Sequence, residues 1–137
     1  MEQKTVYLAL GSNLGDRDAY LKQAILLLGK QVEIEQCSSF LNTKPLYVED
    51  QPDFLNAVVV GKTSLDVFAL LGFVKEIERE MGRVETVRFG ARVIDVDILF
   101  YQGVVVHTDV LVVPHVGVGD RGFLSLLLRE VGFDPIS

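Results

Sequence analysis

A nearly continuous apolar run, Thr-Val-Tyr-Leu-Ala-Leu, occupies residues 5–10. Such a run, bounded by turn residues, is typical of a central strand of a sheet. Gly11, Ser12 and Asn13 follow directly, and their composition indicates a turn at the end of the strand. We therefore expect residues 5–10 to form the strand around which the rest of the fold is arranged.

Three segments after this strand have the pattern of helices. In residues 21–28, apolar side chains recur at i, i+3, i+4 and i+7, and Gly29 is expected to end the helix. Residues 67–81 keep the same period, and Ser64 is expected to cap that helix. A shorter helix is expected over residues 122–131.

Further strands are expected between and after these helices. Residues 31–42 alternate loosely, residues 54–61 are almost entirely apolar, and residues 93–101 form a third candidate, followed by a short strand at 104–106. The order is β-α-β-β-α-β. This order predicts an α+β fold of the ferredoxin-like type, in which two helices cover one face of a mostly antiparallel sheet.

Length and composition limit the classes of function. The 137 residues are 49% hydrophobic and 23% charged, which fits one globular domain spanning residues 1–137. The single cysteine, Cys37, excludes an internal disulfide and a Cys-rich zinc site, and we expect it to be buried. A net charge of −6 argues against nucleic-acid binding. Neither a secretory signal nor a membrane-length apolar run is visible, so we expect a cytoplasmic protein without membrane contact.

Two aspartates, Asp95 and Asp97, stand in the middle of the strand expected at 93–101. Because strand side chains alternate, both lie on one face, with their Cα atoms about 6.5–7 Å apart. Carboxylates this close repel each other unless a cation lies between them or one is protonated. Their hard oxygens suit Mg²⁺ bound together with substrate phosphates. The pair predicts a metal site; the alternative is two solvated side chains on the wet face of the sheet.

Three arginines, Arg83, Arg88 and Arg92, lead directly into this strand, opposed there by Glu85 alone. Guanidinium groups make bidentate contacts with phosphates, so arginines beside a carboxylate pair indicate phosphoryl transfer. The alternative is a solvated basic loop. No P-loop motif is present, which excludes a Walker-type nucleotide site.

Three functions stay open on these residues alone. A phosphoryl-transfer enzyme fits the aspartates and arginines together. A palm-type nucleotidyl transferase also uses paired aspartates on such a sheet, although small size and acidic charge disfavour a polymerase. A ferredoxin-like small-molecule-binding regulatory module without catalysis would not need Asp95.

Seven short motifs occur in order along the chain: LGSNLGD at residues 10–16, QPDFLN at 51–56, GR at 82–83, RFGAR at 88–92, DVD at 95–97, VPH at 113–115 and RGF at 121–123. With these motifs, the chain from about residue 5 to 130 resembles the 6-hydroxymethyl-7,8-dihydropterin pyrophosphokinases of folate biosynthesis. The resemblance implies a ferredoxin-like fold. It also implies transfer of pyrophosphate from ATP to the pterin hydroxymethyl group, giving AMP and the pterin diphosphate.

The resemblance further implies roles for individual residues. Two Mg²⁺ ions would be held by Asp95 and Asp97, and these aspartates with Arg83 and Arg92 would form the catalytic group. The ATP-binding residues would be Glu78, Arg83, Arg92, Ile98, His115 and Arg121. The pterin-binding residues would be Thr43, Pro45, Leu46, Phe54, Asn56 and Phe123. ATP and the pterin would be the partners of a monomeric protein that binds no nucleic acid and no membrane.

Overall fold

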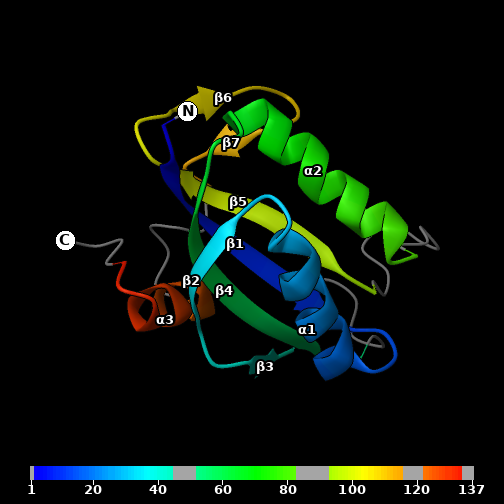
Figure 1. The fold of residues 1–137 in the computed structure, drawn as a ribbon. Helices are drawn as coiled ribbons and strands as arrows, with labels where there is room; N and C mark the ends of the chain where they lie inside the picture. The colour runs from blue at the N-terminus through cyan, green and yellow to red at the C-terminus, as the bar shows by residue number, and fades with distance from the viewer. Residues whose placement is uncertain (1, 45–51, 83–92, 116–121, 134–137) are drawn as a thin grey trace.

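The core of the protein is an antiparallel sheet with helices on both of its faces. In the computed structural model, the described residues are 2–44, 52–82, 93–115 and 122–133 (Figure 1). The strands are β1 (Lys4–Ser12), β2 (Glu33–Cys37), β3 (Leu41–Thr43), β4 (Phe54–Thr63), β5 (Asp95–Tyr101), β6 (Val106–His107) and β7 (Val112–Val113). The helices are α1 (Arg17–Leu28), α2 (Val67–Glu80) and α3 (Phe123–Glu130).

The main sheet has the strand order β2-β4-β1-β5, and β3 extends it by pairing with β4. Each of these pairings is antiparallel. The expected central strand is confirmed, because β1 lies between β4 and β5 and carries the buried side chains of Val6, Leu8 and Leu10. The turn expected at Gly11 and Ser12 is wrong, because both residues continue β1 and pair with β4. Together with the element order, this arrangement confirms the ferredoxin-like α+β fold.

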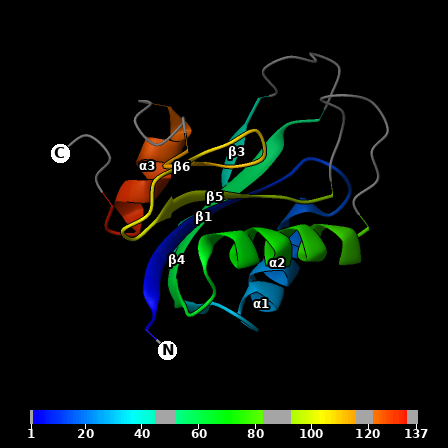
Figure 2. The same cartoon turned by 90° about the horizontal axis from the view of Figure 1, so that it is seen from above.

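The helices divide between the two faces of the sheet (Figure 2). On one face, α1 and α2 cover the larger apolar core, which includes Leu8, Leu21 and Leu70. On the other face, α3 covers a smaller cluster built around Val58 and Leu99. Within the described ranges, no helix is long and apolar enough to cross a membrane.

The strand expected at 31–42 is two strands, because Ser38 interrupts the ladder with β4. The Ser38 hydroxyl accepts a hydrogen bond from the Val58 main-chain N–H at 2.8 Å. The Ser38 main-chain N–H donates to the Val58 carbonyl, also at 2.8 Å. One residue thus takes both polar groups of Val58. As a result, β2 ends at Cys37 and β3 begins separately at Leu41.

Three further expectations need correction. Helix α2 is capped by Asp66 and not by Ser64, because the Asp66 carboxylate accepts from the Ala69 N–H at 2.8 Å. The short strand expected at 104–106 is β6, which starts at Val106. Cys37 is exposed, since it lies in β2, an edge strand of mostly exposed residues.

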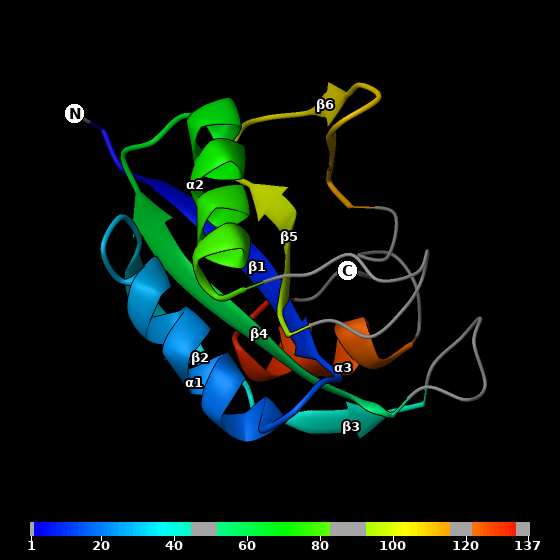
Figure 3. The ribbon, with the colours of Figure 1, turned by 90° about the vertical axis from the view of Figure 1, so that its right-hand side faces the viewer.

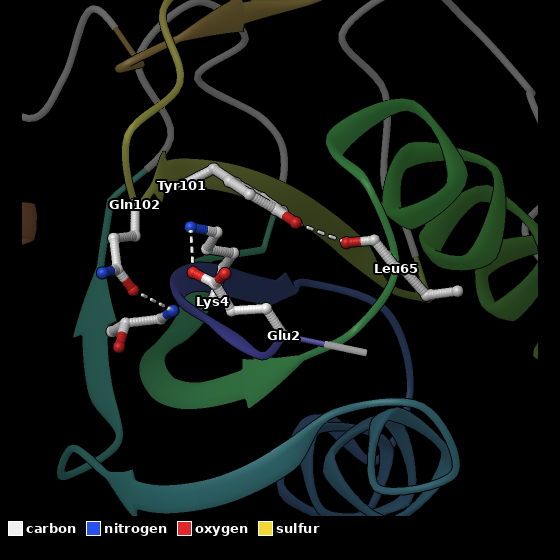
Figure 4. A network of polar contacts seen from close by, with 6 residues as sticks. Glu2, Lys4, Leu65, Tyr101 and Gln102 are labelled. Atoms are coloured by element: carbon white, nitrogen blue, oxygen red, sulfur yellow. Dashed lines mark hydrogen bonds and ion pairs between the residues drawn. The ribbon is translucent and has the colours of Figure 1, made fainter.

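A polar network joins the start of β1 to the end of β5 (Figure 4). The Thr5 N–H donates to Gln102 Oε1 at 2.9 Å, and the Gln102 N–H donates to the Thr5 carbonyl at 2.9 Å. The Tyr101 hydroxyl donates to the Leu65 carbonyl, just before α2. Burial, with a smaller contribution from the Asp66 charge, raises the pKa of Tyr101 above its ordinary value, so the hydroxyl stays a donor into more alkaline solution than a free tyrosine would. These contacts fix the end of β5 remote from Asp95.

The close approach of β2 and β4 requires a glycine at position 61. A Cβ atom added to Gly61 would lie 2.4 Å from the Glu33 carbonyl oxygen and 2.9 Å from Val32 Cγ1. Main-chain atoms of β2 cannot yield as a flexible side chain does. In contrast, a Cβ at Gly72, inside α2, would meet nothing within 4 Å.

We therefore predict opposite effects of two glycine-to-alanine substitutions. Gly61→Ala should lower the free energy of unfolding by about 1–3 kcal/mol, because the new methyl group overpacks the sheet. Gly72→Ala should raise it by about 0.5–1 kcal/mol, because alanine favours the helix. Urea unfolding followed by circular dichroism measures both. Equal stability of the two variants would contradict the assigned approach of β2 to β4.

Candidate functional site

A row of three residues crosses the sheet on the face that carries α3. Strand register places Gly11 of β1 opposite Asn56 of β4 on one side and opposite Asp95 of β5 on the other. Two strand spacings of about 4.8 Å separate Asn56 from Asp95, or about 9.6 Å in all. Because Gly11 has no side chain, nothing of its own fills the space between the amide and the carboxylate.

The expected alternation in β5 is confirmed. Asp95 is half-buried and Asp97 exposed, whereas Val96 between them is 2% exposed. Asp97 lies opposite Ala9, whose small side chain leaves the carboxylate uncovered. Among the described residues, Asp97 forms no hydrogen bond or ion pair. The two carboxylates therefore offer oxygen ligands on one face of a strand.

This donor set fits Mg²⁺. In the described part of the chain, no three His, Cys, Asp or Glu side chains come together as a complete metal site. Mg²⁺ commonly takes only one or two carboxylates and fills its remaining positions with water and substrate phosphates. A pair of aspartates is therefore compatible with a magnesium site that also takes substrate phosphates.

Glu78 and His115 make hydrogen bonds with main-chain groups of β5, at Val96 and at Leu99. Glu78 is 2% exposed, and its Oε2 accepts from the Val96 N–H at 2.9 Å. Its Oε1 lies 3.4 Å from the Lys75 ammonium nitrogen. Further along, the His115 main-chain N–H donates to the Leu99 carbonyl at 2.8 Å. Both contacts hold the strand segment that carries the aspartates.

Two of the expected ATP-binding residues, Glu78 and Ile98, are buried. Glu78 binds the main chain of β5, and the Ile98 side chain, 4% exposed, packs in the core beneath α1 and α2. Ile98 thus lies on the face opposite Asp97. Nucleotide binding by these residues and by His115 stays a prediction.

The amide of Asn56 is held in one orientation. Its Nδ2 donates to the Thr43 hydroxyl at 2.7 Å and to the Leu41 carbonyl at 3.2 Å, so both amide hydrogens are used. Its Oδ1 lies toward Gly11, 3.3 Å from where a Cβ of that residue would be. Within the described ranges this oxygen accepts no hydrogen bond. The residue therefore presents an acceptor to any ligand above Gly11.

Two aromatic residues belong to the same face. Phe54 Cδ1 lies 3.6 Å from the position of a Gly11 Cβ, so its ring borders the same space as the Asn56 amide. Phe123, the first residue of α3, is half-buried against the cluster that contains Val58. Stacking of either ring on a ligand stays a prediction.

Five expected site residues lie outside the described residues: Arg83, Arg92, Arg121, Pro45 and Leu46. The structure adds Gly11, whose place in the row depends on pairing between distant strands. It also adds contacts around Arg17, the residue directly after the motif at 10–16. The sequence signal for Arg17 is its position directly after that motif, which alone indicates only a turn.

Relatives with known names match most of the chain. The pyrophosphokinase named "2-amino-4-hydroxy-6-hydroxymethyldihydropteridine pyrophosphokinase" from Bacillus subtilis (strain 168) is 44% identical over 127 residues, which cover 91% of this chain and 76% of that protein. The protein of the same name from Aquifex aeolicus is 44% identical, with 93% and 79% covered. A "Folate synthesis bifunctional protein, mitochondrial" from Pisum sativum is 42% identical, and the match spans 25% of its length.

A solved structure supports the fold. The Plasmodium falciparum HPPK-DHPS wild type with pteroate superposes with a TM-score of 0.71 at 18% identity, over 94% of this chain and 39% of that one. The family model for 7,8-dihydro-6-hydroxymethylpterin-pyrophosphokinase (HPPK) matches residues 7–132. These matches cover the strands that carry Gly11, Asn56 and Asp95, and the chain belongs to the 7,8-dihydro-6-hydroxymethylpterin-pyrophosphokinase family.

Proposed function

We propose that this protein transfers pyrophosphate from ATP to 6-hydroxymethyl-7,8-dihydropterin, giving AMP and the pterin diphosphate in a Mg²⁺-dependent reaction. The observation that carries this proposal is the row Asn56–Gly11–Asp95 on one face of the sheet. One end of the row offers carboxylates for a metal and its phosphates. The other end offers an oriented amide for a heterocycle.

The carboxylate end is assigned to the phosphates. Asp95 and Asp97 would hold Mg²⁺, and the resemblance to the family implies two ions. Bound Mg²⁺ supplies Lewis-acid polarisation and neutralises phosphate charge. The proposal adds Arg83, Arg92 and Arg121 as further phosphate contacts, because guanidinium groups bind phosphate oxygens in a bidentate manner.

The amide end is assigned to the pterin. A pterin ring carries N–H donors along its edge, and Asn56 Oδ1 is an acceptor whose orientation is fixed by Thr43 and Leu41. Phe54 borders the same space and offers an apolar surface to a flat ring. The pterin would thus be held with its hydroxymethyl group toward the aspartates.

The chain contributes to the reaction mainly by positioning. The hydroxymethyl oxygen forms a bond to the β-phosphorus of ATP and gives up its proton, and the bond from that phosphorus to the oxygen of the α-phosphate breaks, releasing AMP. Holding the alcohol and the triphosphate in line converts a bimolecular encounter into a step within one complex. The hydrogen bond from the Val96 N–H to Glu78 holds the strand segment that carries the two aspartates.

We predict that Asp97→Asn abolishes turnover without loss of fold. The substitution keeps the size of an exposed side chain but removes a negative ligand, and kcat should fall at least about 100-fold because several kcal/mol of charge stabilisation are lost. AMP and pterin diphosphate are quantified after incubation with ATP, the pterin and Mg²⁺, with and without EDTA. Asp109→Asn, an equal charge change at another exposed aspartate, is the matched control. Turnover by Asp97→Asn at the wild-type rate would overturn the metal assignment. A wild-type protein that binds the pterin but releases no AMP would instead favour a non-catalytic binding module.

We predict that Asn56→Ala weakens pterin binding while nucleotide binding is unchanged. Loss of one ligand hydrogen bond and of the fixed amide should raise the pterin Kd about tenfold, the equivalent of about 1.4 kcal/mol. Calorimetric titrations with the pterin and, separately, with a non-hydrolysable ATP analogue measure the two affinities. Circular dichroism of the variant verifies its fold. An unchanged pterin Kd would contradict the assigned contact.

A further inference from the structure

The guanidinium group of Arg17 links helix α1 to Asn42, which precedes residues 45–51, and to Asp53, which follows them. Arg17 begins α1, and its Nη1 donates to Asn42 Oδ1 at 2.8 Å and to the Asp53 carbonyl at 2.7 Å. The Asn42 Nδ2 in turn donates to Asp53 Oδ2 at 2.9 Å. We call these three residues, Arg17, Asn42 and Asp53, the Arg17 clamp.

The Arg17 clamp supports a short strand, β3, whose main-chain ladder joins it to β4 only. Strand β3 has three residues and pairs with β4 alone. A strand this short at the edge of a sheet is weakly held by its ladder. Figure 3 shows β3 beside the first turn of α1, where Asn42 in the middle of the strand meets Arg17. Helix α1 therefore gives β3 an attachment in addition to its ladder with β4 and the packing of Leu41 against the cluster under α3.

Both groups that orient Asn56 lie in this strand. The Thr43 hydroxyl and the Leu41 carbonyl, which receive the two amide hydrogens of Asn56, stand on either side of Asn42. A displacement of β3 would move both acceptors together. The Asn56 amide would then be free to rotate, and its Oδ1 would no longer be fixed toward Gly11.

We propose that Arg17 is a positioning residue for pterin recognition, acting through β3 on the orientation of the Asn56 amide. This inference rests on the proposed function, since it assumes that Asn56 binds the pterin. The Arg17 guanidinium itself binds Asn42 and Asp53. Its removal should therefore affect the pterin and leave the phosphate end of the site, on β5, unchanged.

The decisive experiment compares Arg17→Ala with Lys22→Ala. Lys22 lies on the same helix, carries the same charge and pairs with Asp18 at 2.8 Å, so it controls for charge and for changes in α1. With wild-type protein and both variants, the KM for pterin, the KM for ATP and kcat are measured. Arg17→Ala should raise the pterin KM about tenfold, as expected for the loss of about 1.4 kcal/mol, with kcat and the ATP KM within about twofold. Lys22→Ala should behave as wild type.

Two further variants keep the inference testable if Arg17→Ala folds poorly, and one spectroscopic measurement reports on Asn56 directly if it folds. Arg17→Lys keeps a cation with three donors and should recover part of the pterin affinity. Asn42→Ala removes the contact to β3 but leaves the bond from Arg17 to the Asp53 carbonyl, and should still raise the pterin KM. In NMR spectra without ligand, the side-chain amide protons of Asn56 should exchange faster in Arg17→Ala than in Lys22→Ala.

The outcomes separate the inference from the proposed function. If wild-type protein neither binds nor converts the pterin, the proposed function fails. If wild-type protein does so and Arg17→Ala keeps its pterin KM and Asn56 exchange rate, the positioning role of Arg17 is overturned. Equal losses toward pterin and ATP would also overturn it, because they would indicate a general structural role.

Discussion

The two antiparallel ladders that β1 forms with β4 and β5 determine the site. They place Gly11 between Asn56 and Asp95, so residues 39 or more positions apart in the sequence meet in one row. Side chains alternate along a strand, and a slip of one residue in either ladder would move a member of the row to the opposite face. Register at β1 is held by Val6, Leu8 and Leu10, which are buried beneath α1 and α2. Core packing on one face of the sheet thus determines which side chains lie together on the other face.

Local periodicity was enough to predict the central strand, α1, α2 and the shared face of Asp95 and Asp97. Each of these depends on side chains a few positions apart, so the pattern is complete within one segment. The break in the strand expected at 31–42 was not predictable in this way. It arises because Ser38 takes both main-chain groups of Val58, a residue in another strand. The cap at Asp66 competed with an equally suitable residue at Ser64, and only the helix start distinguishes the two.

Within the site, sequence reasoning identified residue types better than their connections. Asn56 is named by the family resemblance, but the donors of its amide are fixed by Thr43 and Leu41, whose position depends on a strand of three residues. Glu78 resembles any acid on a helix. Its burial and its bond to the Val96 N–H depend on how α2 lies along the edge of β5. Such contacts between distant segments carry no local periodicity.

The face of the sheet that carries α3 is core at one end and open at the other. Val58 and Leu99 lie beneath α3, whereas Asp97, also on this face, is exposed. Val58 follows Asn56 by two positions in β4, and Leu99 follows Asp97 by two positions in β5, so these neighbours on one face have Cα atoms about 6.5–7 Å apart. Leu41 and Phe123 also pack against the same cluster. Substitutions this close are not expected to act independently, so repacking the interior under α3 should also reach the ligand-facing residues.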